Sequence, residues 1–262
     1  MNYRIHFSCI SHPGSRRRIN QDNFICDGRY MQAENDGTVF PIEGYVSANA
    51  SAVFGVFDGM GGEECGEVAS FIAAEAAASL RIGGDVIGDI SAYCTRANGE
   101  ICRYAAENGI GTMGTTAAMM VFAPDEIVLC NIGDSRIYRF SGGRLEQISQ
   151  DHTAVGIYGR KPPLSQHLGI PPSELLIEPY LAAGRYNKND IYLICSDGLT
   201  DMLNNEEIRE LLCDKKFDGI APRLLNRAIE KGGKDNISLI LCRIERDMLG
   251  REGKKAKNMK EV

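Results

Sequence analysis

The stretch Ser51-Ala52-Val53-Phe54-Gly55-Val56-Phe57-Asp58-Gly59-Met60-Gly61-Gly62 joins a largely apolar run to a carboxylate and a cluster of glycines. Residues 51–57 are rich in valine and phenylalanine, which is typical of a buried strand. The run ends abruptly at Asp58, and the glycines after it allow the backbone to pass close to a metal ion or a phosphate group. The stretch therefore predicts a buried strand that brings a carboxylate to the edge of its sheet.

Three other apolar strands end or begin at an aspartate. Residues 127–132 lead into Asp134, residues 191–195 lead into Asp197, and Asp235 precedes the last strand, 237–245. An isolated Asp-Gly pair usually forms a plain turn, and we assign the pairs at 27–28, 36–37 and 218–219 to such turns. Four carboxylates at strand ends instead favour convergence at one edge of a sandwich.

Converged carboxylates repel one another unless protons or cations balance their charge. An all-oxygen set of ligands suits Mg²⁺ or Mn²⁺ better than zinc. The four histidines are dispersed and lack the spacing of zinc ligands. The pattern therefore predicts a site for a hard divalent cation.

Helices occur in two blocks and strands in several, without strict alternation. This favours the α+β class with antiparallel sheets over a doubly wound parallel sheet. We expect helices at 64–80, 90–108, 204–213 and 218–231, and strands at 3–11, 22–27, 51–57, 115–122, 126–132, 136–140, 144–148, 190–196 and 237–245. The short links between 115 and 148 predict an antiparallel meander. Residues 28–50 are expected to form a hairpin or a loop-rich insertion, and the proline-rich residues 154–176 a loop.

Composition narrows the class of protein. The 262 residues are 44% hydrophobic and 24% charged with a net charge of −6, which argues against a nucleic-acid partner. Apolar runs are too short for membrane insertion, and nine scattered cysteines predict buried, reduced thiols. We therefore expect a cytoplasmic protein, a monomer by default, with one domain at 1–248 and a disordered basic tail at 249–262.

Six motifs follow one another along the chain: Arg17-x-x-Asn20-Gln21-Asp22, Asp58-Gly59-Met60-Gly61-Gly62, Met113-Gly114-Thr115-Thr116, Gly133-Asp134-Ser135-Arg136, Ser196-Asp197-Gly198-Leu199 and Asp235-Asn236. In this order they resemble the 2C-type, metal-dependent Ser/Thr protein phosphatases (the PPM family), most of all the compact bacterial members. The resemblance covers residues 4–246. It implies a four-layer α-β-β-α sandwich of two antiparallel sheets flanked by helices.

The resemblance also implies metal ligands. Asp58 is expected to bridge two metal ions, and the carbonyl of Gly59 to bind one of them. Asp197 and Asp235 complete the pair. Asp134, together with Asp197, is expected to form a weaker third site.

Two further residues take roles beside the ions. The resemblance implies that Asp22 holds metal-bound waters and that Arg17, rather than Arg16 or Arg18, binds the substrate phosphate. The implied reaction is hydrolysis of phosphoserine and phosphothreonine in proteins by a hydroxide shared between two Mn²⁺ or Mg²⁺ ions. In the cell this signalling enzyme would oppose a bacterial Ser/Thr protein kinase.

Some positions depart from the family pattern. Eukaryotic relatives often carry a histidine where Met60 stands, and a methionine cannot protonate the leaving group, so the proton donor is left open. Gln21 replaces a commoner glutamate, and the insertion at 28–50 has no assigned function. Residues 154–176 fall where bacterial relatives carry a flap beside the active site.

Two other functions compete with this one. A pseudophosphatase that only binds phosphoproteins is disfavoured because Asp58, Asp197 and Asp235 are all present. A nucleotide-binding oxidoreductase is disfavoured because Glu64 stands where the third glycine of the dinucleotide motif should be.

Overall fold

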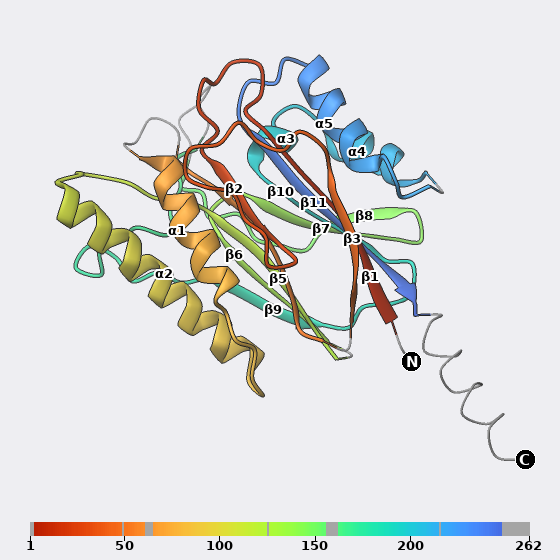
Figure 1. Ribbon diagram of the computed structural model, residues 1–262, viewed down its shortest axis with the longest axis horizontal. Helices are drawn as coiled ribbons and strands as arrows, with labels where there is room; N and C mark the ends of the chain where they lie inside the picture. Colours follow the sequence, from red (N-terminus) through yellow and green to blue (C-terminus); the bar gives the residue numbers. More distant parts are fainter. Residues whose placement is uncertain are drawn as a thin grey trace, which may run out of the picture.

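Two antiparallel sheets pack face to face, and helices cover both outer faces (Figure 1). The computed structural model describes residues 3–48, 50–60, 65–124, 126–155, 162–214 and 216–247. The six-stranded sheet has the order β3 (Ile42–Ser47), β1 (Tyr3–His12), β11 (Ile237–Arg246), β10 (Ile191–Cys195), β7 (Arg136–Ser141) and β8 (Arg144–Gln147). The five-stranded sheet has the order β2 (Asp22–Cys26), β4 (Ala52–Asp58), β5 (Ala117–Ala123), β6 (Glu126–Ile132) and β9 (Tyr180–Gly184).

The helices divide between the two outer faces. The five-stranded sheet is covered by α1 (Gly66–Ala78) and α2 (Val86–Asn108). The six-stranded sheet is covered by α3 (Asp197–Thr200), α4 (Asn205–Leu212) and α5 (Ile220–Glu230). The expected α-β-β-α sandwich of the α+β class is therefore confirmed.

Three separate apolar cores lie between these four layers. The core between the sheets is aromatic: the ring of Phe54 lies 5.5 Å from that of Phe7 and 5.9 Å from that of Phe122. Alternate residues of β4 face opposite cores, with Phe54 and Val56 between the sheets and Phe57 under the helices. The strand is apolar throughout because both of its faces are covered.

Local sequence signals mark two helix ends, the start of α4 and the end of α2. The helix predicted at 204–213 begins with a capping box, since Asn204 Oδ1 accepts from the backbone N–H of Glu207 at 3.0 Å and Glu207 Oε2 accepts from that of Asn204 at 3.2 Å. Gly109 ends α2 with a φ of 68°, a left-handed conformation that favours glycine.

The predicted meander from 115 to 148 is wrong. The strands β5 and β6 form a hairpin in the five-stranded sheet, whereas β7 and β8 form a hairpin in the six-stranded sheet. The link at 133–135 carries the chain from one sheet to the other, and Gly133 makes the turn with a φ of 101°. A short link shows that two strands meet at their ends, and it does not show that they share a sheet.

Other differences concern short or edge elements. The edge strand β9 and the four-residue α3 were not predicted, whereas β3 falls inside the insertion where weak strands were expected. Residues 162–176 form no helix or strand, as expected for a loop.

The basic tail at 249–262 lies outside the described residues, so the predicted domain boundary stays a prediction.

The cysteines are free thiols, and six of the nine are buried, as predicted. Cys213 is an exception because it is exposed. Over the residues that the structure describes, no helix is both long enough and apolar enough to cross a bilayer.

We predict that Phe54→Ala lowers the free energy of unfolding by about 3 to 5 kcal/mol, because it leaves a cavity between the two sheets. Phe40→Ala is the matched control, since Phe40 is 77% exposed, and its effect should stay below about 0.5 kcal/mol. Urea unfolding followed by circular dichroism measures both. Equal losses for the two variants would contradict the assigned core.

Candidate active site

Four carboxylates from four separate chain segments line one cavity. Asp58 ends β4, Asp134 lies in the link between β6 and β7, Asp197 opens α3 after β10, and Asp235 precedes β11. The cavity has a volume of about 520 Å³. The structure therefore brings together the strand ends that the sequence singled out. Arg17, Met60, Thr112, Thr116, Pro162, Pro163, Leu164 and His167 complete its lining.

Asp22 lies beside this cluster and is buried. It stands directly opposite Asp58 in the antiparallel pair of β2 and β4. Its Oδ2 accepts a hydrogen bond of 2.8 Å from Ser196 Oγ, whereas its buried Oδ1 has no hydrogen-bond partner among the described residues. Burial raises the pKa of Asp22 to about 7, and the bond from Ser196 opposes this shift only in part.

Thr116 fixes the backbone at Asp58 through its hydroxyl group and its own backbone N–H. The N–H of Asp58 donates to Thr116 Oγ1 at 3.0 Å, and the carbonyl of Asp58 accepts from the N–H of Thr116 at 2.9 Å. Thr116 Oγ1 also lies 2.7 Å from Ser135 Oγ. Thr116, Ser135 and Ser196 belong to the sequence motifs, but no role was assigned to them from the sequence. Their place in the motifs that carry or adjoin the aspartates was the one sign that they support the site.

Gly59 is required by a close approach of backbone segments. Its N–H donates to the carbonyl of Gln21 at 3.1 Å. A Cβ at Gly59 would overlap the carbonyl of Gly66 and lie 2.6 Å from that of Gln21. The sequence predicted a close approach to a ligand here, and the structure adds an approach of the chain to itself.

Asn236 ties the segment of Asp235 to the first motif. Its Oδ1 accepts from the N–H of Gln21 at 2.9 Å, and its Nδ2 donates to the carbonyls of Pro13 and Ile19 at 3.0 and 2.9 Å. A Cβ at Gly198 would overlap the carbonyl of Asn236. These contacts fix the positions of Asp197 and Asp235 relative to residues 13–22.

The insertion also contacts the first motif. Asn20 Nδ2 donates to Asn35 Oδ1 at 2.8 Å and to Ser11 Oγ at 3.0 Å. The N–H of Thr38 donates to the carbonyl of Ser11 at 2.9 Å. The first part of the insertion is therefore anchored next to the active-site loop.

Arg17 is the member of the arginine triplet that lines the cavity. Its Nη2 donates to Asp235 Oδ2 at 2.8 Å, and its side chain is 39% exposed. Arg16 and Arg18 are exposed and do not line the cavity. The choice of Arg17 over its neighbours agrees with this geometry, although its role stays a proposal.

His167 contributes an imidazole that sequence reasoning did not single out for the site. Its Nδ1 lies 3.0 Å from the carbonyl oxygen of Leu168. A carbonyl can only accept, so Nδ1 carries a proton and Nε2 is left for other partners. The segment that carries His167 is anchored by Leu168, whose backbone pairs with Thr115.

Oxygen atoms dominate the donor set. Across the described part of the chain, no three His, Cys, Asp or Glu side chains stand close enough to form a preassembled metal cage. The buried Oδ1 of Asp22 nevertheless has no hydrogen-bond partner among the described residues, and four carboxylates line one cavity. Both features suit hard divalent cations, which prefer oxygen ligands.

Comparison with known proteins decides the family. Residues 42–241 match the sequence profile described as Protein phosphatase 2C. The Serine/threonine protein phosphatase PstP of Mycobacterium tuberculosis is 32% identical over 230 residues, which cover 82% of this chain and 43% of PstP. The chain belongs to the protein phosphatase 2C family. The Serine/threonine phosphatase stp of Listeria monocytogenes is 31% identical over 219 residues, covering 74% of this chain and 84% of that protein.

Solved structures of the 2C family share the fold. The catalytic domain of PstP in complex with two manganese ions has a TM-score of 0.75 and 28% identity, covering 93% of this chain and 99% of that one. PppA of Pseudomonas aeruginosa has a TM-score of 0.76 at 24% identity, which supports the fold alone. The chain thus spans less than half of the length of full-length PstP.

The raised pKa of Asp22 predicts a pH dependence of stability in chelator. The folded state keeps this proton up to about pH 7, whereas the unfolded state loses it near pH 4, so the folded state binds more protons between these values. The free energy of unfolding contributed by Asp22 should therefore fall as the pH rises through this interval. Urea unfolding at several pH values should show a flatter profile for Asp22→Asn. Identical profiles for the variant and the wild type would contradict the assignment.

Proposed function

We propose that the chain is a metal-dependent protein phosphatase that removes phosphate from phosphoserine and phosphothreonine in proteins. One observation carries the proposal: Asp58, Asp134, Asp197 and Asp235 line the same cavity as Arg17. The carboxylates provide a place for cations, and the guanidinium group provides a place for a phosphate. This pairing suits phosphoryl transfer, in which positioning and charge stabilisation do most of the catalysis.

Asp58, Asp197 and Asp235, with the carbonyl of Gly59, would hold two Mn²⁺ or Mg²⁺ ions. Asp134 with Asp197 would hold a weaker third ion. Bound divalent cations lower the pKa of a shared water and so supply a hydroxide nucleophile at neutral pH. Asp22 would accept hydrogen bonds from waters through its Oδ1, which has no protein partner in the described part of the chain.

Arg17 would bind the phosphate of the substrate. Its pairing with Asp235 holds the guanidinium group at the cavity, with 39% of the side chain open to solvent. A planar guanidinium can donate two parallel hydrogen bonds to phosphate oxygens. The substrate phosphate would then share or replace the contact that Arg17 makes with Asp235.

The alkoxide that leaves needs a proton, and Met60 cannot supply it, because a thioether has no acidic hydrogen. Met60 lines the cavity, so the wall of the cavity is apolar at this point. The donor therefore has to be another group of the cavity or a water.

The biological setting completes the proposal. The substrates would be phosphorylated proteins, the opposing enzyme a bacterial Ser/Thr kinase, and the compartment the cytoplasm, with the protein acting as a monomer. A pseudophosphatase remains the alternative, and activity decides between the two.

We predict that the full chain releases phosphate from a phosphothreonine peptide in Mn²⁺ and loses this activity in chelator. Asp58→Asn and Asp235→Asn should each lower kcat by at least about 100-fold, because several kcal/mol of transition-state stabilisation are lost and each 1.36 kcal/mol is tenfold. Malachite-green detection of phosphate measures the rate.

Asp36→Asn is the matched control for those two variants. Asp36 also belongs to an Asp-Gly pair, but it is exposed and lies in the insertion, so full activity is expected. Activity that survives chelation would contradict the metal mechanism. A rate of phosphate release by Asp58→Asn equal to that of the wild type would contradict the assignment of Asp58 as a metal ligand.

We predict that Arg17→Ala lowers kcat/KM for the phosphopeptide about tenfold or more, since a charged hydrogen bond to phosphate is lost. Inorganic phosphate should also inhibit this variant more weakly. Arg18→Ala, an exposed neighbour outside the cavity, should retain both wild-type values. Equal effects of the two variants would contradict a specific role for Arg17. They would show that the three arginines at 16–18 attract phosphate only through their combined positive charge.

A further inference from the structure

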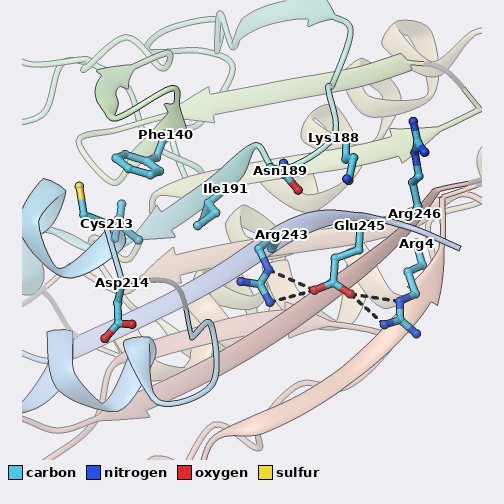
Figure 2. Close-up of a pocket in the computed structure, with 11 residues that line it drawn as sticks. Arg4, Phe140, Lys188, Asn189, Ile191, Cys213, Asp214, Arg243, Glu245 and Arg246 are labelled. Carbon is cyan, nitrogen blue, oxygen red and sulfur yellow. Dashed lines mark hydrogen bonds and ion pairs between the residues drawn. The ribbon is translucent and has the colours of Figure 1, made fainter. Parts of the chain in front are cut away.

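A second and larger cavity lies at the other end of the six-stranded sheet. Its volume is about 680 Å³, and Figure 2 shows the residues that line it. Arg4 comes from the start of β1, Arg243 and Arg246 from the end of β11, and Lys188 from the link between β9 and β10. Because a strand rises about 3.4 Å per residue, the ten residues of β11 separate this cavity from Asp235 by roughly 30 Å.

Glu245 organises the basic end of this cavity. Its Oε2 accepts hydrogen bonds of 3.2 and 2.9 Å from Arg4, and its Oε1 accepts bonds of 3.1 and 2.9 Å from Arg243 (Figure 2). Burial favours the protonated acid, but these hydrogen bonds outweigh it and lower the pKa of Glu245. The carboxylate is therefore charged at neutral pH and fixes both guanidinium groups in place.

Aromatic rings hold the same two guanidinium groups from the side. Arg4 lies 4.1 Å from the centre of the Tyr45 ring, and Arg243 lies 4.7 Å from that of Phe217. Their side chains are thus ordered before any ligand arrives, which reduces the entropy that binding has to offset.

Two further cations carry charge that the cavity does not balance. Lys188 and Arg246 make no hydrogen bond or ion pair with any side chain that the structure describes. Among the described residues that line the cavity, the acidic ones are Glu245, shared by two arginines, and Asp214, which pairs with Arg223 at 2.8 Å. The cavity therefore has a positive excess in a chain whose net charge is −6.

The opposite end of the cavity carries apolar side chains beside the carboxylate of Asp214, which pairs with Arg223. Figure 2 shows Phe140 and Ile191 on the side of Cys213, away from Lys188 and Arg246. Leu212 adds a third apolar side chain to the lining. A ligand that fills the cavity must therefore present an apolar group at one end and negative charge at the other.

We propose that this cavity docks an acidic segment of a partner protein. One large apolar side chain of the segment packs on Phe140 and Ile191, and neighbouring Asp or Glu side chains contact Lys188, Arg246 and Arg4. The site lies far from the phosphatase centre, so peptide binding does not depend on the proposed catalytic function.

Charge argues against other occupants. Residues 250–262 of this chain carry five Lys or Arg against two Glu, so the chain's own end is repelled by the cavity. A second copy of the chain that docked symmetrically would bring the same positive group to this face. The net charge of −6 also disfavours a nucleic acid as the anionic ligand.

The test uses the full chain and a fluorescein-labelled peptide with one Phe followed by a run of Asp and Glu. Fluorescence anisotropy at low salt should show saturable binding, and a peptide with Lys in place of the acids should not bind. Lys188→Glu combined with Arg246→Glu should weaken binding about tenfold or more. Phe140→Ala should weaken binding of this peptide but not of a version with Gly in place of Phe.

Arg81→Glu combined with Arg103→Glu is the matched control. Both arginines are exposed, and the pair changes the net charge equally without touching the cavity. This variant should bind within about twofold of the wild type. Circular dichroism spectra and urea unfolding midpoints that match those of the wild type show that all variants are folded.

Three outcomes would overturn the proposal. The first is that the wild-type chain does not bind the acidic peptide at low salt. The second is that the control pair loses as much affinity as the cavity pair, since binding would then follow net charge alone. The third is that the chain ignores the peptide but binds phosphatidylserine vesicles, or associates with itself, through the same residues.

Discussion

Asp22 and Asp58 stand opposite each other on adjacent antiparallel strands, and two carboxylates this close repel each other strongly when one of them is buried. Cations must balance that charge for the fold to keep both groups ionised; otherwise a proton must neutralise one of them. Burial raises the pKa of Asp22 to about 7, and the charge of Asp235 adds to this rise, so an ionised Asp22 is costly without a cation. Many of the surrounding contacts act to hold these acids in place.

Both sheets contribute to this arrangement. Asp22 and Asp58 belong to the five-stranded sheet, whereas Asp197 follows and Asp235 precedes strands of the six-stranded sheet. The bond from Ser196 to Asp22 joins one sheet to the other directly at the site. Face-to-face packing of two sheets thus creates the cavity, and the same strands carry an independent basic cavity at their far ends.

Predictions from the sequence succeeded where the signal was local. The capping box of Asn204 and Glu207 needs only four consecutive residues, and the apolar strands that end in aspartate each carry their own signal. The meander failed because pairing of β6 with β7 depends on which sheet each strand joins, and a three-residue link serves either arrangement.

The positions of the site residues were predictable only through ordered motifs. Contacts such as Asn236 to Gln21 join segments far apart in the chain, and no local pattern encodes them. The same holds for Arg4 and Arg243, which meet at Glu245 only because β1 pairs with β11. Residues of the distal cavity therefore had no signal in the sequence.

The central claim is that cations balance the converged carboxylates, and Mn²⁺-dependent thermal unfolding tests it without reference to turnover. Binding to the folded state alone raises its stability. We predict that Mn²⁺ raises the Tm of the wild-type chain well above its value in chelator, and that Asp58→Asn loses most of this increase. An equal increase in both proteins, or none in the wild type, would contradict it.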